Sequence, residues 1–260
     1  MFTLGPNALA WKLFSKSHKD SGKVEPPNPS LFGSVICACG QPGTGKTYKI
    51  VRLSYKAAWK HGLPLIIQDT KGDATIYHRK LIETLSKRSD STSKRKVEWL
   101  QSKQHVRLFN QRETDWFMSV LKRLETKARN VSVREAEIIA CIEEGGALRS
   151  DNENFWDVAR GFRNAGVTAY TTVHKDTDIT RSARQCLRAV ILDRPYEESV
   201  EFFGVDIPAM ECSPPMSDTV TFIDSFDRTV KRFDMVKEWD RVPSVLIDPV
   251  QPTNVESITF

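Results

Sequence analysis

The sequence contains no apolar run that approaches the roughly 20 residues needed to cross a bilayer, so we expect no transmembrane segment. The N-terminal stretch holds a short apolar patch with no basic segment ahead of it, which is not the pattern of a secretory signal peptide. The pattern indicates instead an N-terminal arm over 1–33 that docks on the domain or on a partner.

Cysteine is scarce as well, with five residues in 260. None forms a C-x-x-C pair, and none is grouped with histidines at the spacing of a zinc site. Cys37 and Cys39 stand two apart in an apolar run, so they face the same side of the expected strand. We expect them to be small core residues of a protein in a reducing compartment.

The sequence also lacks a strong excess of one charge, because 38 lysines and arginines against 33 acids give a net charge of +5. This balance permits a polyanionic partner but does not require one. Positive charge is concentrated in the Ser-rich stretch 86–96, which we expect to be a mobile loop. Two interpretations of this stretch stay open, a DNA contact and a solvated linker. Its basic residues are Lys87, Arg88, Lys94, Arg95 and Lys96.

Patterns typical of strands alternate with helical ones over most of the chain, without an internal repeat. Nearly continuous apolar runs are typical of strands that are buried on both faces of a parallel sheet. The alternation predicts an α/β fold with a mostly parallel central sheet, right-handed crossovers and helices on both faces. We expect strands at 34–40, 63–69, 105–109, 137–146, 167–174 and 188–192, helices at 46–62, 74–88, 112–129 and 151–166, and a C-terminal antiparallel hairpin of 218–224 with 228–235.

The first expected strand leads into a glycine-rich segment, CGQPGTGKTY, at 39–48. It fits the pattern G-x-x-x-x-G-K-[ST], whose glycines let backbone N–H groups turn inward around phosphates. The helix that follows directs its N-terminal dipole at the same anion. Lys46 is expected to reach the β- and γ-phosphates of ATP, and the Thr47 hydroxyl to ligate Mg²⁺. The predicted nucleotide-binding residues are Gly40, Gln41, Pro42, Gly43, Thr44, Gly45, Lys46, Thr47 and Tyr48.

An ATP-hydrolysing site of this kind also needs an acid at the end of another strand. The apolar run in 137–146 leads into Glu143 and Glu144. We assign Glu143 to Mg²⁺, through water, and Glu144 to polarising the attacking water as general base. A water-activating carboxylate favours hydrolysis over phosphoryl transfer. A nucleotide kinase stays open because the arginines clustered in 178–188 resemble a kinase lid.

Further segments follow the phosphate loop in a definite order: QDTKGD at 68–73, IEEGGAL at 142–148, GFRNAGV at 161–167 and TTVH at 171–174. Together they resemble the FtsK–HerA superfamily of DNA-pumping ATPases, including its conjugation-coupling and viral genome-packaging members. The resemblance spans about residues 34–192. It implies a RecA-like (ASCE) P-loop NTPase fold.

Two positions depart from the pattern of that superfamily. Glu143 stands where the superfamily usually has aspartate, and its longer side chain carries the carboxylate about 1.5 Å further out. His174 stands where glutamine is usual. A neutral imidazole donates one hydrogen bond to a γ-phosphate or to water, and it makes activity sensitive to pH near neutrality. A strand-end histidine without a catalytic role is the alternative.

The resemblance also implies a homo-oligomeric ring, a pentamer or hexamer, in which an arginine of one subunit completes the site of the next. We expect Arg163, or Arg160 beside it, to act in this way. DNA threaded through the ring would meet cations that contact its backbone without reading sequence. Lys71 and Lys175 join the basic stretch as candidates for these contacts.

These features predict an ATPase that translocates DNA and packages a viral genome into a preformed capsid. A bare motor domain, expected at 34–236 with a tail at 237–260, suits a protein that docks on a capsid vertex or on membrane-associated virion proteins. We expect it in the host cytoplasm, in the virion, or in both. Other cytosolic DNA translocases or helicases, and conjugation-type coupling ATPases, stay open. An assembly protein that binds ATP without pumping also stays open.

Overall fold

The protein is described here from a computed structural model. The predicted N-terminal arm and C-terminal tail lie outside the described residues, and so do Arg181 and Arg184 of the arginine cluster in 178–188. Among the helices that are described, none is both long and apolar enough to span a membrane. The described residues are 35–128, 138–148, 154–180, 183, 186–203, 219–224 and 230–234.

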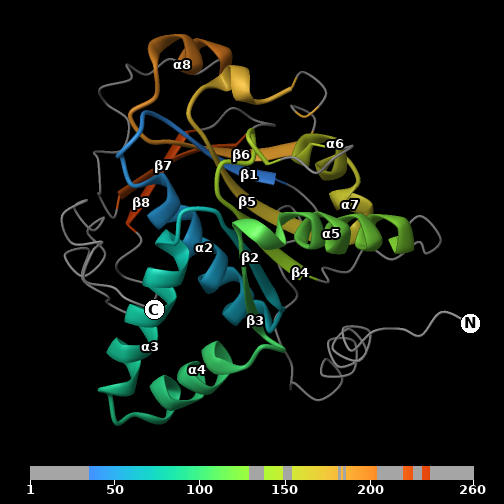
Figure 1. Ribbon diagram of the computed structural model, residues 1–260. Helices are drawn as coiled ribbons and strands as arrows, with labels where there is room; N and C mark the ends of the chain where they lie inside the picture. Colours follow the sequence, from blue (N-terminus) through green and yellow to red (C-terminus); the bar gives the residue numbers. More distant parts are fainter. Residues whose placement is uncertain are drawn as a thin grey trace, which may run out of the picture.

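A single eight-stranded sheet forms the centre of the molecule (Figure 1). Six neighbouring strands run parallel, and the last two in the chain continue the sheet antiparallel at one edge. This arrangement confirms the predicted α/β fold with a mostly parallel sheet. The strand order is β3 (Val106–Asn110), β2 (Leu65–Asp69), β4 (Ile138–Ile142), β5 (Val167–Val173), β1 (Val35–Cys39), β6 (Leu187–Leu192), β7 (Thr219–Asp224) and β8 (Val230–Asp234).

Helices cover both faces of this sheet, and each face has its own apolar core. The central strands β1, β4 and β5 are buried along their whole length, which explains their nearly continuous apolar sequence. One face carries α2 (Lys46–His61), α3 (Asp73–Ser86) and α4 (Ser91–Gln101), the other carries α5 (Thr114–Ala128), α6 (Phe155–Ala159) and α7 (Phe162–Ala165), and α8 (Glu197–Phe203) follows β6 (Figure 1).

Parallel strands bring their carboxyl ends to one edge of the sheet, and polar residues follow these ends. Gly40 follows β1, Glu143 follows β4, His174 follows β5 and Asp193 follows β6, while Asp69 is the last residue of β2. Residues that are far apart in the sequence therefore meet at this edge, which is the edge that holds the phosphate loop.

The expectation of a mobile loop at 86–96 is wrong, because most of this stretch belongs to α4. Asp90 caps the helix, since its carboxylate accepts a 2.8 Å hydrogen bond from the Ser93 backbone N–H. Trp99, further along the helix, is buried in the core of that face. A helix cap and an apolar anchor thus outweigh the basic, serine-rich composition of the stretch.

The single helix expected over 151–166 is also wrong within the described residues, which form two short helices, α6 and α7. The break falls at Arg160 and Gly161, and glycine is a weak helix former. Phe155 in α6 and Phe162 in α7 are both fully buried. Packing of the two aromatic rings therefore fixes each short helix on the sheet.

Candidate active site

The glycine-rich segment forms a tight loop between β1 and the start of α2. Gly43 and Gly45 adopt left-handed backbone conformations, with φ of 75° and 90°, which only glycine adopts at low cost. No side chain caps the N-terminus of α2, and no acid lies in its first turn. The amides of this helix end are therefore available for an anion, and the helix dipole favours one.

Lys46 is folded into the loop, where only 7% of the residue is exposed. Its Nζ donates a 2.7 Å hydrogen bond to the Gln41 carbonyl, to which the Thr44 hydroxyl also donates at 2.9 Å. Burial lowers the pKa of Lys46, and the carboxylate of Asp193 partly offsets this. The loop thus holds a buried cation beside uncapped amides, which is a suitable environment for phosphate oxygens.

The end of β6 packs directly against the base of this loop. The Asp193 N–H donates a 2.9 Å hydrogen bond to the Cys39 carbonyl, and the Gln41 N–H donates at 3.1 Å to the Arg194 carbonyl. A Cβ atom added at Gly40 would overlap the Asp193 carbonyl. Glycine is therefore required at position 40 by the close approach of β6.

A buried ion pair lies beneath the loop, and the sequence reasoning missed it. Lys49 Nζ donates a 2.6 Å hydrogen bond to Asp193 Oδ1, and both side chains are fully buried. Burial raises the pKa of Asp193 to about 6, although Lys49 and Lys46 oppose the rise. The available signal was that Asp193 follows an apolar strand directly, as Glu143 does.

Glu143 lies against the turn after β2 and is only 1% exposed. Its Oε2 accepts hydrogen bonds from the backbone N–H groups of Thr70 and Lys71, at 3.1 and 3.2 Å. Burial, with the charges of Asp69 and Asp73, raises the pKa of Glu143 to about 8. Its Oε1 has no hydrogen-bond partner. This oxygen suits the predicted role toward Mg²⁺, since a nearby divalent cation favours the ionised carboxylate.

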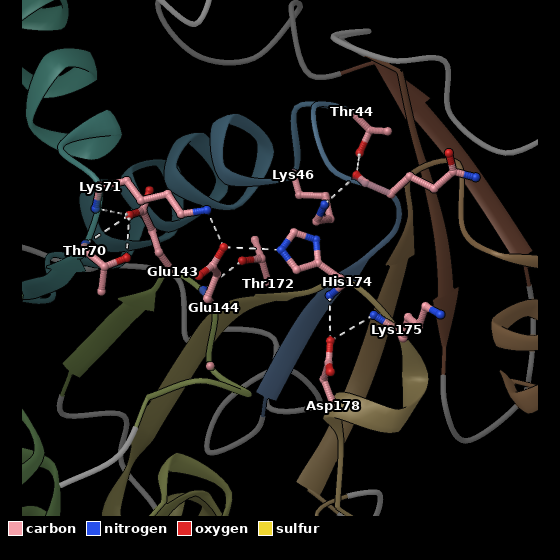
Figure 2. Close-up of polar contacts among 12 residues, drawn as sticks. Thr44, Lys46, Thr70, Lys71, Glu143, Glu144, Thr172, His174, Lys175 and Asp178 are labelled. Carbon is pink, nitrogen blue, oxygen red and sulfur yellow. Dashed lines mark hydrogen bonds and ion pairs between the residues drawn. The ribbon is translucent and has the colours of Figure 1, made fainter. Parts of the chain in front are cut away.

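Glu144 turns the opposite way, and Figure 2 shows its carboxylate between Lys71 and His174. Its Oε1 forms an ion pair with Lys71 Nζ and lies 3.3 Å from His174 Nε2. Burial by itself raises the pKa of Glu144, but the hydrogen bonds and charges of Lys71 and His174 outweigh burial and hold the pKa below its ordinary value. Glu144 is therefore ionised at neutral pH, and its charge acts on Lys46.

The residues that flank these acids are held by short-range hydrogen bonds. Asp69 accepts from the Gly72 and Thr75 N–H groups, both at 2.8 Å, and so shapes the turn from β2 into α3. Asp178 accepts from the His174 and Lys175 N–H groups, both at 3.0 Å, and fixes the segment that follows β5. Lys71 and Lys175 thus lie at the same sheet edge as the phosphate loop.

Other predicted site residues lie elsewhere. Tyr48 is buried, with its ring near Tyr77 of α3 and its hydroxyl bonded to Arg52, so its side chain belongs to the core. Arg163 is exposed in α7, which precedes β5. The seven-residue length of β5, about 23 Å, therefore separates it from the strand end that carries His174. The cations of 86–96 likewise lie at the far edge of the sheet, where α3 ends and α4 begins.

The fold and the site together define a class of protein. The strand that carries Glu143 and Glu144 is not adjacent to β1, because β5 lies between them and pairs with both. A phosphate loop after β1, acids after β4 and a polar residue after the intervening strand form the arrangement of a RecA-like P-loop NTPase fold. This is the predicted fold class.

Solved structures with this fold include viral and secretion ATPases, whereas no protein-family model and no curated protein matches the sequence. The genome packaging NTPase B204 from Sulfolobus turreted icosahedral virus 2, in complex with AMPPCP, matches 80% of this chain and 98% of its own, with a TM-score of 0.51 and 13% identity. EssC (ATPases 2 and 3) from Geobacillus thermodenitrificans matches 83% of this chain and 42% of its own, with a TM-score of 0.55 and 14% identity. The cytoplasmic domain of the Thermomonospora curvata type VII secretion ATPase EccC matches 77% and 25%, with a TM-score of 0.51 and 16% identity. At these identities the likeness shows the fold, and it agrees with the predicted resemblance to FtsK–HerA ATPases.

Proposed function

We propose that this chain is an ATP-hydrolysing motor that translocates DNA and packages a viral genome into a preformed capsid. The observation that carries the proposal is the position of Glu144, whose carboxylate is held by Lys71 and His174 at the end of β4, one strand away from the strand that leads into the phosphate loop. The match to B204, which covers 98% of that packaging NTPase, supports the choice among the functions of this fold. The motor domain is proposed to comprise residues 34–236.

The phosphate loop binds the triphosphate of ATP. The amides at the start of α2 and around Gly43 and Gly45 receive the phosphate oxygens. Lys46 exchanges its bond with the Gln41 carbonyl for bonds to the β- and γ-phosphates. Thr47 and, through water, Glu143 would hold Mg²⁺, which would neutralise phosphate charge.

Glu144 polarises the attacking water and accepts its proton. Its backbone N–H donates to the Thr172 hydroxyl at 2.9 Å, and its carboxylate contacts Lys71 and His174, so the side chain is oriented before substrate arrives. His174 donates a hydrogen bond to the γ-phosphate or to the water. A nucleotide kinase needs no carboxylate in this position, which favours hydrolysis.

The site is completed by a neighbouring subunit in a pentameric or hexameric ring. Arg163, or Arg160 beside it, is exposed at the opposite edge of the sheet and cannot serve the phosphate loop of its own subunit without crossing the length of β5. In a ring it reaches the next subunit and stabilises charge on the transferred phosphoryl group. DNA contacts Lys71, Lys175 and the cations around α4. The ring docks on a capsid vertex or on membrane-associated virion proteins, in the host cytoplasm or the virion.

A second candidate is a translocase or coupling ATPase outside genome packaging. The specific observation for it is that EssC and EccC match with TM-scores of 0.55 and 0.51, as well as B204 does. This alternative uses the same ATP chemistry and differs in the molecule that the ATPase moves. An assembly protein that binds ATP without pumping shares only the nucleotide site.

ATP turnover with and without long duplex DNA separates these functions. A DNA motor hydrolyses ATP several-fold faster with DNA, and Lys46→Ala abolishes turnover in both conditions because the phosphates lose their cation. Arg123→Ala, which removes an exposed cation of α5 on the other face of the sheet, is the control and is expected to hydrolyse like the wild type. Turnover without any response to DNA, together with ring assembly on ATP binding, contradicts the motor and favours the assembly protein. If the function is genome packaging, capsids assembled with the Lys46→Ala protein are expected to remain empty of DNA.

A further inference from the structure

A second surface lies at the edge of the sheet opposite the phosphate loop, where α2 ends, α4 passes and β3 begins (Figure 1). These elements enclose an open pocket of about 270 Å³. None of its residues belongs to the candidate active site. The pocket is lined by Trp59, Arg95, Glu98, Trp99, Ser102 and His105.

Aromatic rings form the floor and walls of this pocket. Trp59 and Trp99 meet edge to face with ring centroids 5.6 Å apart, and the His105 ring lies nearly parallel to Trp99, at 20° and 6.4 Å. Trp99 is mostly buried and holds the arrangement, whereas Trp59 and His105 are partly exposed. Partly exposed aromatic rings are the platforms on which planar groups stack.

Positive charge borders these rings. Arg95, Trp99 and Ser102 recur at the helical spacing i, i+4 and i+7, so one face of α4 turns an arginine toward the pocket. Lys96 Nζ lies 6.0 Å from the centroid of the Trp59 ring. Lys56 lies one helical turn before Trp59. Its pKa is lowered mainly by burial and then by the charge of Lys60. Arg95 and Lys96 therefore place positive charge beside the aromatic rings.

We propose that this pocket binds an unpaired base of single-stranded nucleic acid, with Arg95 and Lys96 on the phosphates that flank it. Stacking tolerates every base, and phosphate contacts carry no sequence information, so the site binds without sequence preference and weakens with salt. Glu98 and Ser102 provide polar groups at the rim for base edges. The combination of partly exposed aromatic rings and adjacent cations matches a base between phosphates better than it matches an acidic peptide. The biological role of this site rests on the proposed function, because the site would contact unpaired bases of the DNA that the motor moves.

The test measures binding of a fluorescently labelled oligothymidine, about 20 nucleotides long, to the full chain without ATP. We expect wild-type tryptophan fluorescence to be quenched on binding, and Trp59→Leu to weaken binding at least five-fold, as loss of a stacking platform does. Trp59→Phe, which keeps a ring face, retains most of the affinity. Arg95→Ala weakens binding and reduces its salt dependence. Arg123→Ala removes an exposed arginine from α5, on the other face of the sheet, and is the matched control without effect.

Several results would overturn the inference. One such result is an equal loss of affinity in Arg95→Ala and Arg123→Ala, and another is unchanged binding in a folded Trp59→Leu protein. A third is competition by polyglutamate that is as effective as competition by unlabelled oligothymidine. Each would show that the pocket is only a general anion-binding surface. ATP turnover is measured separately in the absence of nucleic acid. A wild type without turnover refutes the ATPase and leaves the oligonucleotide result standing, whereas turnover without stacking-dependent binding refutes only this inference.

Discussion

Glu144 has a left-handed backbone conformation with φ of 51°, which is costly for a residue with a side chain. Its N–H is fixed by the Thr172 hydroxyl, and a Cβ at the following Gly145 would collide with Thr171. The tight turn directs the Glu144 carboxylate away from Glu143, so two adjacent acids meet different partners. Glu143 becomes a buried carboxyl with a raised pKa and Glu144 an ionised one, which are the separate properties expected of a metal-shell residue and a base.

The Lys49–Asp193 pair gives a pH-dependent stability prediction. Lys49→Met removes the cation that opposes the rise in the pKa of Asp193, so that pKa moves above its wild-type value of about 6. When an acid has a higher pKa in the folded state than in the unfolded state, the protein loses stability as pH rises from the unfolded pKa toward the folded one. We therefore expect the free energy of unfolding of Lys49→Met to fall by about 2 kcal/mol more than that of the wild type between pH 6 and pH 8.

Urea unfolding of both proteins across this pH range measures the difference. The double variant Lys49→Met/Asp193→Leu lacks the titrating carboxyl and is the control, in which the additional pH dependence disappears. A gap between Lys49→Met and the wild type that stays constant from pH 6 to pH 8 would show that removal of Lys49 does not raise the pKa of Asp193 into this range.

At the scale of elements, the sequence was most informative where the physical cause is local. Buried parallel strands need apolar residues at every position, and the phosphate loop needs glycines at fixed spacing, so both could be predicted. Lys49 and Asp193 are 144 residues apart, and their pairing depends on β6 lying beside β1. The pocket at Trp59 and Trp99 depends in the same way on α2 meeting α4. Pairings of this kind have no signal in a single sequence.

Contact between α2 and α3 gives a second pH prediction. The Tyr55 hydroxyl and His78 Nδ1 form a 2.6 Å hydrogen bond, and burial lowers the pKa of His78 to about 4. A histidine with a lowered pKa contributes stability that is complete above its unfolded pKa of 6.5 and is lost as pH falls through 4. Between pH 7 and pH 4.5 the wild type is expected to lose about 2 kcal/mol more than His78→Gln, whose amide can still bond Tyr55 without titrating. Equal losses of stability in the two proteins would show that a group other than His78 causes the acid sensitivity.

At the scale of the whole molecule, the phosphate loop and Arg163 occupy opposite edges of the sheet. An arginine so placed is useful to catalysis only if subunits are arranged in a closed ring, in which the same two surfaces meet at every seam. The proposed ring therefore explains why Arg163 and the phosphate loop lie at opposite edges of the sheet, because Arg163 lies on one side of each seam and ATP on the other.

Mixing of inactive variants tests this arrangement. Arg163→Ala is expected to lose ATP turnover, and Lys46→Ala loses it independently. In mixed rings some seams combine the intact Arg163 of a Lys46→Ala subunit with the intact phosphate loop of an Arg163→Ala subunit, so turnover returns in part. Absence of rescue at every mixing ratio, in rings shown to exchange subunits, would count against a role of Arg163 in trans.

The central claim is that a triphosphate bound at residues 40–47 is cleaved by water that Glu144 activates. Single-turnover hydrolysis of bound ATP by Glu144→Gln tests it most directly, because the amide keeps the shape of the side chain and cannot accept the proton. The account predicts that Glu144→Gln binds ATP as tightly as the wild type and hydrolyses it at least 100-fold more slowly, within the usual range for loss of a general base. Hydrolysis at the wild-type rate would contradict it.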